Sequence, residues 1–301
     1  MKFFDKALKQ AQAQRPRVEP LVSPEEPQTG INPLPPEGEP TGSPKAVQEI
    51  CYTHTRKVPV DVNTLIRNRL IVGSADTAIV QGYKLLRTHI LQKTWDEHRN
   101  ILMVISPLPD EGKTLTATNL AISMAQELDK TVLLVDADLR APSINRYFGM
   151  EPGKGLVDYL EGRMSIPDLL VHPQGLDRLV ILPGGRPTEW AAELIRSPRM
   201  LQLVPELKNC YPDRYVIFDL PPLLAYADAL AFAPLVDGIL IVVQARKTTR
   251  EDLARCLEML EDFPVLGYVL NGFDEVDSSR YYRHNGHQGE GWLSRLKLGK
   301  S

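Results

Sequence analysis

Short apolar runs alternate along this chain with longer amphipathic stretches. The apolar runs predict buried strands at residues 100–105, 131–136, 178–182, 215–219, 238–243 and 265–270. The amphipathic stretches predict helices at residues 75–93, 114–127, 156–162, 190–196, 200–207 and 250–261. Because strands and helices alternate, we expect an α/β fold with a doubly wound, mainly parallel sheet and helices on both faces.

The first 60 residues lack this pattern, and ten of the 25 prolines fall there. A segment so rich in proline cannot build a packed core, so residues 1–60 are expected to form an extended, semi-rigid tether. Residues 1–15 combine near-helical apolar spacing with lysine and arginine. They fit either a short helix that binds a partner or membrane surface, or a frayed tail. We expect a nucleotide-binding domain at residues 61–273 and a flexible tail at 274–301.

The segment SPLPDEGKT, residues 106–114, joins the first strong strand to a helix. It ends like a Walker A loop, in which backbone N–H groups and a helix N-terminus surround a phosphate. Lys113 is expected to reach the β- and γ-phosphates, and the Thr114 hydroxyl to ligate Mg²⁺. The alternative is an ordinary strand-to-helix turn. The expected nucleotide-binding residues of this loop are Pro109, Asp110, Glu111, Gly112, Lys113, Thr114 and Leu115.

Two positions of this loop depart from the Walker A pattern. Pro107 occupies the place of the first glycine, and Asp110 stands where related loops often carry glycine. Aspartate tolerates the positive φ that glycine permits better than most residues do. Its carboxylate is unfavourable near a triphosphate unless it faces solvent or the cation. We therefore expect Asp110 to weaken ATP binding without abolishing it.

Two further strands end in carboxylates. Residues 131–140, TVLLVDADLR, end in the pattern DxDxR, and residues 215–222, YVIFDLPP, end in DxPP, a Walker B signal. Ligands of doubly wound sheets collect at the carboxyl ends of strands. Asp136, Asp138 and Asp219 should therefore share one crevice with Lys113 and Thr114, and hard oxygen ligands suit Mg²⁺ on a triphosphate. Any one of these aspartates alone would be read as a strand-end or helix-cap residue.

The altered Walker A loop, DxDxR and DxPP together resemble the bacterial tyrosine kinases of capsule and exopolysaccharide biosynthesis. These are cytoplasmic P-loop autokinases of the deviant Walker group, which also contains the partitioning and septum-site ATPases. Further similar segments bring the resemblance to about residues 75–273: LPGG at 182–185, ELIRSPRM at 193–200, VDGILIVV at 236–243 and LGYVLN at 266–271. The ATPases carry a signature lysine five residues before the Walker lysine, where this chain has Leu108.

The resemblance implies ATP and Mg²⁺ as cofactors and suggests a role for each carboxylate. Lys113 and the loop backbone would hold the phosphates, while Thr114, Asp138 and Asp219 would hold Mg²⁺. Asp136 is expected to be the base that accepts the tyrosine proton, although sequence alone does not order Asp136 and Asp138.

Two more residues of the expected nucleotide site have alternative explanations. Arg140 would either stabilise phosphate charge or pair with Asp138. Asn271 matches the position that contacts adenine in the resembled family, and otherwise it is a simple turn residue.

The acceptor expected from the resemblance is a C-terminal tyrosine. Members of the family usually end in a cluster of tyrosines, whereas this tail offers Tyr281 and Tyr282 between Arg280 and Arg283. A flexible tail would enter a neighbour's active site, and phosphorylation would add negative charge beside the arginines. The alternative is that both are ordinary exposed tyrosines.

Self-association is also expected, but the helix pattern through which the resembled family associates is altered in this chain. The resembled family pairs subunits in a ring through an E-x-x-R-x-x-R helix pattern, which reads Gln81, Lys84 and Arg87 here. The missing acid removes one partner of an intersubunit ion pair, and lysine lacks the bidentate fork of arginine.

Composition narrows the function classes. A chain with 43% hydrophobic residues, 24% charged residues and a net charge of −3 is typical of a soluble enzyme and gives no reason to expect nucleic acid binding. Its three scattered cysteines indicate free thiols in a reducing cytoplasm. Since no apolar run is long enough to span a membrane, a separate membrane adaptor, a polysaccharide co-polymerase, is the expected partner at the inner face of the plasma membrane.

The main hypothesis is an autokinase that regulates polysaccharide polymerisation or export. A non-kinase ATP-binding switch or scaffold is the alternative. A metabolic ATPase such as a cofactor-synthesis ligase is disfavoured, because no distinct substrate motif is present.

Overall fold

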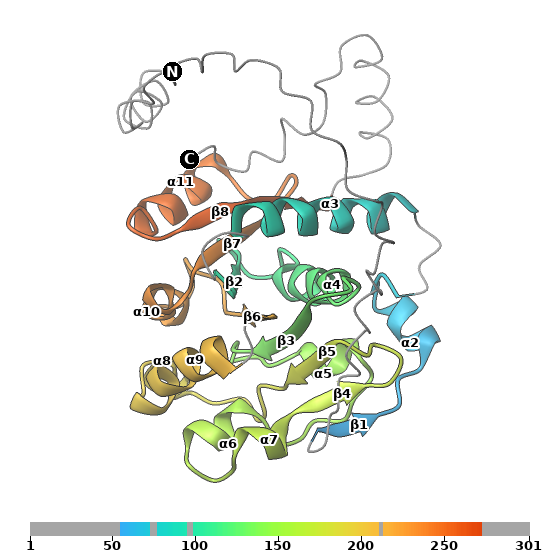
Figure 1. Cartoon of the computed structure of the whole chain (residues 1–301). Helices are drawn as coiled ribbons and strands as arrows, with labels where there is room; N and C mark the ends of the chain where they lie inside the picture. The colour runs from blue at the N-terminus through green and yellow to red at the C-terminus, as the bar shows by residue number, and fades with distance from the viewer. Residues whose placement is uncertain (1–54, 73–76, 95–98, 211–212, 273–301) are drawn as a thin grey trace, which may run out of the picture. The chain divides into compact units, whose positions relative to one another are not determined.

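A mainly parallel sheet forms the centre of the protein (Figure 1). The computed structural model describes residues 55–72, 77–94, 99–210 and 213–272. The strands of the described part are β1 (Arg56–Val58), β2 (Ile101–Ile105), β3 (Thr131–Asp136), β4 (Val171–Pro173), β5 (Leu179–Leu182), β6 (Arg214–Asp219), β7 (Gly238–Gln244) and β8 (Val265–Asn271). Their spatial order is β1-β4-β5-β3-β6-β2-β7-β8. Neighbouring strands pair in parallel except β4 and β5, which are antiparallel.

Helices cover both faces of the sheet. Those on one face are α2 (Val62–Arg67), α3 (Thr77–Thr94), α4 (Lys113–Met124) and α5 (Ile144–Tyr147). Those on the other are α6 (Leu156–Leu160), α7 (Ile166–Leu169), α8 (Ala191–Ile195), α9 (Pro198–Cys210), α10 (Asp228–Phe232), followed by the short 3₁₀ helix η1 (Ala233–Leu235), and α11 (Arg250–Met259).

The central strand β2 shows why its sequence is continuously apolar. Ile101, Met103 and Ile105 belong to the core beneath α6–α11, whereas Leu102 and Val104 belong to the core beneath α2–α5. Side chains of a strand point alternately to opposite faces. A strand covered by helices on both faces therefore needs apolar residues at every position.

The fold class expected from the sequence is confirmed, since the sheet is mainly parallel and doubly covered. The predicted strands correspond to β2, β3, β5, β6, β7 and β8, and the predicted helix at residues 75–93 is α3. Strands β1 and β4, three residues each, were not predicted, because they are too short to show a period. Strand β1 also precedes residue 60, where the sequence suggested a domain boundary.

Helix α3 is fastened to α4 by Arg87. The guanidinium donates to the carbonyl oxygen of Ser123 at 2.8 Å and lies 2.7 Å from the Glu127 carboxylate. This residue of the altered ring pattern therefore makes contacts within its own subunit. Assembly into a ring stays a prediction.

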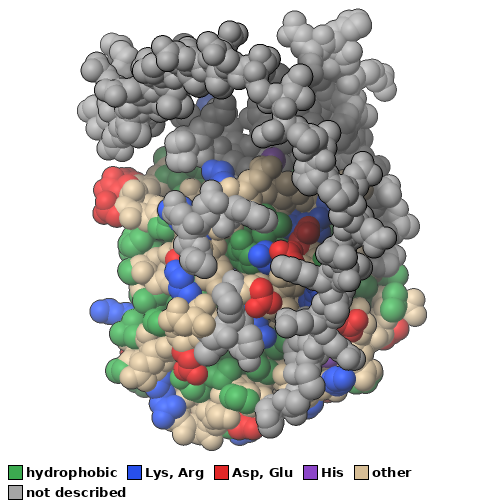
Figure 2. Space-filling view, in the orientation of Figure 1, with side chains coloured by type: hydrophobic (Ala, Val, Ile, Leu, Met, Phe, Trp, Pro, Cys, Tyr) green, Lys and Arg blue, Asp and Glu red, His purple; other side chains and the backbone are tan. Residues whose placement is uncertain are grey.

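Two segments for which the sequence made predictions lie outside the described residues. They are the proline-rich segment before residue 55 and the tail that carries Tyr281 and Tyr282. Within the described ranges, none of the helices is both long and apolar enough to cross a membrane. On the face drawn in Figure 2, basic and acidic side chains are interspersed.

Candidate active site

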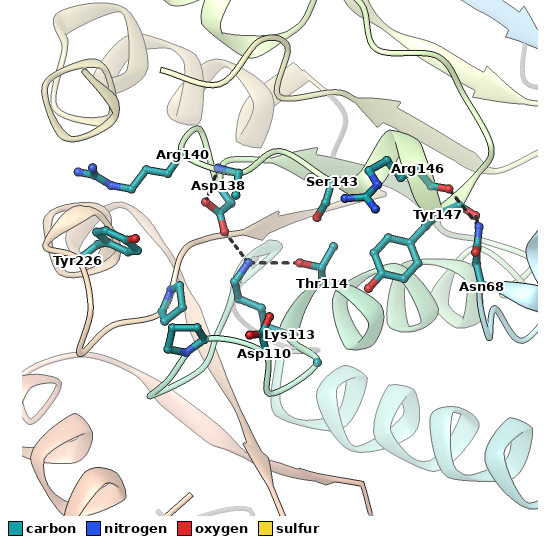
Figure 3. A pocket seen from close by; sticks show the side chains of 14 residues that line it. Asn68, Asp110, Lys113, Thr114, Asp138, Arg140, Ser143, Arg146, Tyr147 and Tyr226 are labelled. Carbon is teal, nitrogen blue, oxygen red and sulfur yellow. Dashed lines mark hydrogen bonds and ion pairs between the residues drawn. The ribbon is translucent and has the colours of Figure 1, made fainter. Parts of the chain in front are cut away.

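A pocket of about 900 Å³ opens at the carboxyl ends of the central strands (Figure 3). The start of α4, which follows the loop after β2, contributes Lys113 and Thr114 to its lining, and the loop after β3 contributes Asp138 and Arg140. The segment after β6 adds Pro222 of the DxPP motif and Tyr226. The three motifs identified in the sequence therefore meet at one site, as parallel strands with a shared carboxyl edge require.

The phosphate loop has the backbone shape that its glycine and aspartate positions predict. Gly112 precedes α4 with φ 86°, and Asp110 has φ 57°. Both values lie in the left-handed region, which aspartate tolerates better than most side chains. A side chain at Gly112 is excluded for a second reason, because its Cβ would lie 2.1 Å from Nδ2 of Asn271. Asp110 therefore adopts the positive φ that glycine would permit at this position.

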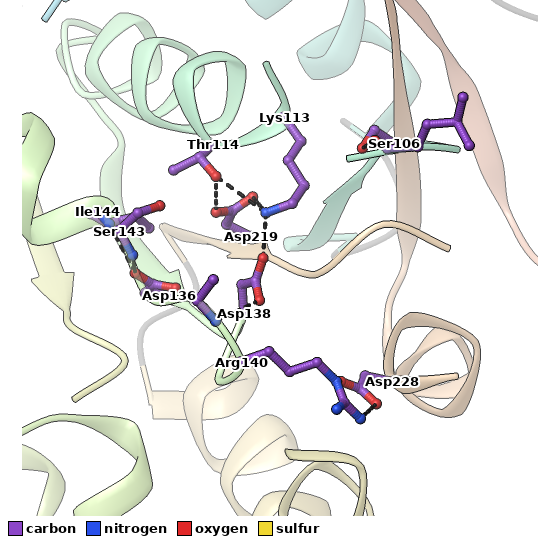
Figure 4. A network of polar contacts seen from close by, with 12 residues as sticks. Ser106, Lys113, Thr114, Asp136, Asp138, Arg140, Ser143, Ile144, Asp219 and Asp228 are labelled. Atoms are coloured by element: carbon purple, nitrogen blue, oxygen red, sulfur yellow. Dashed lines mark hydrogen bonds and ion pairs between the residues drawn. The ribbon is translucent and has the colours of Figure 1, made fainter. Parts of the chain in front are cut away.

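Lys113 extends from the first residue of α4 into a cluster of carboxylates (Figure 4). Its ammonium lies 2.7 Å from Asp138 and 3.5 Å from Asp219, and donates to the Thr114 hydroxyl at 3.2 Å. Burial alone would lower the pKa of Lys113, but the negative charges of Asp219 and Asp138 outweigh it and raise the pKa. Lys113 is therefore held as a cation inside the pocket.

Thr114 and Asp219 form the part of the site that suits a divalent cation. The Thr114 hydroxyl donates to Oδ2 of Asp219 at 2.6 Å, and Asp219 is fully buried. Burial raises the pKa of Asp219, while Lys113 and Thr114 oppose that rise. The buried Oδ1 atoms of Asp219 and Asp136 accept no hydrogen bond from the described residues. Oxygen atoms beside a hydroxyl and a phosphate loop fit Mg²⁺, which is commonly bound through one or two carboxylates and substrate phosphates.

The two aspartates of DxD occupy different surroundings. Asp136 is buried behind the pocket lining, and its Oδ2 accepts hydrogen bonds from the backbone N–H groups of Ser143 at 2.8 Å and Ile144 at 2.9 Å. Burial, followed by the charge of Asp219, raises the pKa of Asp136 to about 7. Asp138 lines the pocket and accepts from the N–H of Ala141 at 3.2 Å. Asp138 is thus the carboxylate of this pair that faces the pocket.

Arg140 pairs with Asp228, and not with Asp138 as one reading of the sequence suggested. Its Nε lies 2.7 Å and its Nη2 3.0 Å from the two carboxylate oxygens of Asp228, which is a bidentate contact. The guanidinium also lies 4.5 Å from the centre of the Tyr226 ring. The expected pairing was wrong because Asp138 is already engaged by Lys113. Arg140 nevertheless lines the pocket, and its contact with phosphate stays a prediction.

Comparison with known proteins agrees with this geometry. The family model of the CobQ/CobB/MinD/ParA nucleotide binding domain matches residues 102–287. The tyrosine-protein kinase YwqD of Bacillus subtilis (strain 168) is 35% identical over 217 residues, which cover 71% of this chain and 90% of that protein. The chain belongs to the bacterial tyrosine-protein kinase family.

Two further relatives of this bacterial tyrosine kinase place it in context. The succinoglycan biosynthesis transport protein ExoP of Rhizobium meliloti (strain 1021) is 33% identical over 230 residues, 72% of this chain but 29% of that protein. The solved kinase domain of the Escherichia coli tyrosine kinase ETK is 31% identical with a TM-score of 0.60, covering 64% of this chain and 75% of that one. The region of this kinase that matches its relatives thus covers most of the length of YwqD but under a third of the length of ExoP.

Three residues of this kinase that were predicted to bind nucleotide lie outside the pocket lining. Asn271 donates from Nδ2 to the carbonyl oxygen of Glu111 at 2.9 Å, and its contact with adenine stays a prediction. The buried Glu111 side chain accepts from the N–H of Leu108 at 2.8 Å and from the Thr248 hydroxyl. Leu115 lies half-buried in the first turn of α4.

Several residues of the kinase site were not predicted from the sequence. Asn68, Tyr147 and Tyr226 line the pocket, and Thr248 contacts the loop from the turn after β7. A signal existed for Thr248 and Tyr226, since each follows a strand whose carboxyl end lies at the same sheet edge. No comparable signal existed for Asn68, which comes from the segment between α2 and α3.

Proposed function

We propose that this protein is an ATP-dependent protein-tyrosine autokinase with Mg²⁺ as its cofactor. The observation that carries the proposal is the meeting of Lys113, Thr114, Asp138 and Asp219 at the ends of three adjacent strands beside a phosphate loop. Membership of the tyrosine-protein kinase family supports it. Phosphoryl transfer depends mainly on positioning and charge neutralisation, which these residues supply.

Each residue has a part in the transfer. Lys113 exchanges the Asp138 carboxylate for phosphate oxygens, while the loop N–H groups bind the same phosphates. Thr114 and Asp219 would hold Mg²⁺, which would neutralise phosphate charge when bound. The tyrosine oxygen bonds to the γ-phosphorus as the bond to the ADP oxygen breaks, and a carboxylate takes the phenolic proton.

We assign the proton to Asp138, because it faces the pocket and becomes free when Lys113 turns to the phosphates. Asp136, expected from the sequence to be the base, is assigned instead to holding the loop at Ser143 and Ile144.

The proposed acceptors are Tyr281 and Tyr282 of another copy of the chain. They lie outside the described residues, and the proposal rests on their place in a tail flanked by arginines. Phosphorylation would place about two negative charges on each tyrosine, next to Arg280 and Arg283. This change of charge would regulate self-association.

The biological role we propose is control of exopolysaccharide or capsule polymerisation and export. The name of ExoP, a succinoglycan biosynthesis transport protein, supports this class of process. The proposed partner is a membrane adaptor of the co-polymerase type, which would hold the kinase at the inner face of the plasma membrane.

The test is phosphopeptide mass spectrometry on the purified chain after incubation with ATP and Mg²⁺. The samples are wild type, Lys113→Met, Tyr281→Phe with Tyr282→Phe, and Lys57→Met as a control on the exposed edge strand β1. The same set is repeated with the cytoplasmic segment of a candidate adaptor. Phosphotyrosine that is lost in the first two variants and kept in the control is expected.

A nucleotide-dependent switch without kinase activity is the second candidate. The position of Asp110 in the pocket lining favours it, because a carboxylate beside the phosphates weakens nucleotide binding. Nucleotide binding without phosphotyrosine, with or without the adaptor segment, would establish the switch and overturn the kinase proposal.

A further inference from the structure

A lysine that belongs to none of the nucleotide-binding motifs binds the phosphate loop at residues 109 and 110. Lys247 lies in the turn between β7 and α11. Its ammonium donates to the carbonyl oxygen of Pro109 at 2.6 Å and to that of Asp110 at 3.2 Å. Asn271, at the end of β8, donates to the next carbonyl oxygen, that of Glu111, at 2.9 Å. Three consecutive loop carbonyls are therefore bound by side chains from the turn after β7 and from the end of β8.

The direction of these carbonyls fixes the direction of the loop N–H groups. A trans peptide unit is planar, and its C=O and N–H bonds point to opposite sides. When Pro109, Asp110 and Glu111 turn their carbonyls toward Lys247 and Asn271, the N–H groups of residues 110, 111 and 112 turn away from them. Successive N–H groups on one side of a loop form an anion-binding concavity. Asp110 and Gly112 line the pocket, so this concavity belongs to the phosphate site.

The turn that carries Lys247 is itself fixed. The Thr248 hydroxyl accepts from the N–H of Gln244 at 2.8 Å and donates to the buried carboxylate of Glu111. The N–H of Lys247 donates to the carbonyl oxygen of Gln244 at 3.2 Å, which closes the turn. The backbone of Lys247 is therefore already fixed by hydrogen bonds. Less conformational entropy is lost when its side chain binds the loop carbonyls.

The charge of Lys247 adds to its geometric effect. Its ammonium, beside residues 109 and 110, raises the positive potential where the triphosphate would lie. It also offsets part of the negative charge of Asp110. Both side chains are exposed, so this contribution is screened by salt. The geometric effect on the carbonyls does not depend on salt in this way.

We propose that Lys247 is a positioning residue of the nucleotide site, which holds the phosphate loop with its N–H groups facing the phosphates. The inference rests on the nucleotide site of the proposed function. It concerns how tightly nucleotide is bound and leaves the chemical step to Lys113 and the carboxylates.

The test measures the Kd of fluorescent ADP with Mg²⁺ and the KM and kcat of autophosphorylation in the full chain. Removing a charged hydrogen-bond donor from this loop in Lys247→Met is expected to raise Kd and KM about tenfold. The kcat at saturating ATP should stay within about twofold of wild type, because Lys247 makes no contact with the reacting groups. Lys247→Arg should keep most of the affinity, since its N–H groups retain the charge and reach two acceptors.

Two comparisons separate positioning from a general loss of stability. Lys57→Met removes an exposed lysine from β1 and should leave Kd, KM and the melting temperature unchanged. Thr248→Val, which removes the hydroxyl that joins the turn to Glu111, should raise Kd in the same direction as Lys247→Met.

An unchanged Kd in Lys247→Met, or a lower melting temperature without loss of affinity, overturns the inference. An equal loss in Lys57→Met overturns it as well. If wild type itself binds no ADP, the proposed function is overturned. If wild type binds ADP and Lys247→Met binds it equally well, only this inference is overturned.

Discussion

Lys113 and Asp138 form an ion pair with 2.7 Å between the ammonium and the carboxylate, inside the pocket that both residues line. The proposed function requires the same ammonium to bind phosphate. Nucleotide binding therefore replaces one anionic partner of Lys113 by another and leaves Asp138 facing the bound molecule. Coupling the binding of nucleotide to the release of a carboxylate is a direct consequence of this geometry.

Replacing the two DxD aspartates separately should identify the proton acceptor. Asp138→Asn is expected to lower the kcat of autophosphorylation by about 10²- to 10⁴-fold, the usual contribution of a general base. Nucleotide affinity should be kept or improved, because Lys113 loses a competing partner. Asp136→Asn should reduce kcat less, since an amide oxygen can still accept the two backbone N–H groups.

The measurement is kcat and the Kd of ADP for both variants, with Asp262→Asn as an exposed control. A larger loss of kcat in Asp136→Asn than in Asp138→Asn would restore Asp136 as the base, as the resemblance to the family first suggested.

The raised pKa of Asp136 predicts how stability depends on pH. Its pKa is about 7 in the folded protein, against 3.8 for an aspartate in water. The folded state therefore binds more protons between these values, and the contribution to stability is fully present below about pH 4 and is lost as pH rises through about 7. Asp136→Asn should remove a slope of up to about 1.4 kcal/mol per pH unit in this window.

Urea unfolding of nucleotide-free protein from pH 5 to pH 8 measures this slope. The exposed Asp262→Asn variant should retain the wild-type slope. Equal slopes for wild type and Asp136→Asn would show that burial does not raise the pKa of this carboxyl.

The sequence predicted the parts of the site that lie at strand ends. Strands β2, β3 and β6 are apolar through their middle positions because helices cover both of their faces, so their ends, and the position of Asp219, could be read directly. The pairing of Arg140 with Asp228 was missed because these residues are 88 positions apart and meet only through the placement of α10. Glu111 was expected to bind nucleotide through the loop backbone, which stays a prediction, but the contact of its buried side chain with Thr248 was not predicted. Such contacts depend on tertiary packing, which leaves no local period.

The Arg140–Asp228 pair should stabilise the protein. Asp228 is buried whereas Arg140 is more than a quarter exposed, with side-chain exposures of 1% and 28%. Asp228→Asn weakens the bidentate contact with Arg140. Because water partly screens the Arg140 guanidinium, we expect the free energy of unfolding to fall by about 1–3 kcal/mol. Chemical unfolding at pH 7.5 measures it, with the exposed Asp213→Asn as control. A change below about 0.5 kcal/mol, the usual range for surface substitutions, would count against this stabilising role.

Asp110 is expected to weaken nucleotide binding through its charge. Its carboxylate belongs to a residue in the pocket lining, so Asp110→Gly should bind ATP about threefold to tenfold more tightly, a modest factor because the side chain is exposed. Glycine also adopts the φ of 57° found at this position without strain. Asp110→Asn separates the two effects, because asparagine removes the charge and still tolerates a left-handed backbone.

Titration of fluorescent nucleotide at low and at high salt measures both variants. If charge is the cause, Asp110→Asn recovers most of the gain, and the gain shrinks at high salt because exposed charges are screened. A gain confined to Asp110→Gly would instead assign the effect to the backbone. Unchanged affinity in both variants would show that the carboxylate faces solvent, and that the departure from the Walker A pattern at this position leaves nucleotide binding intact.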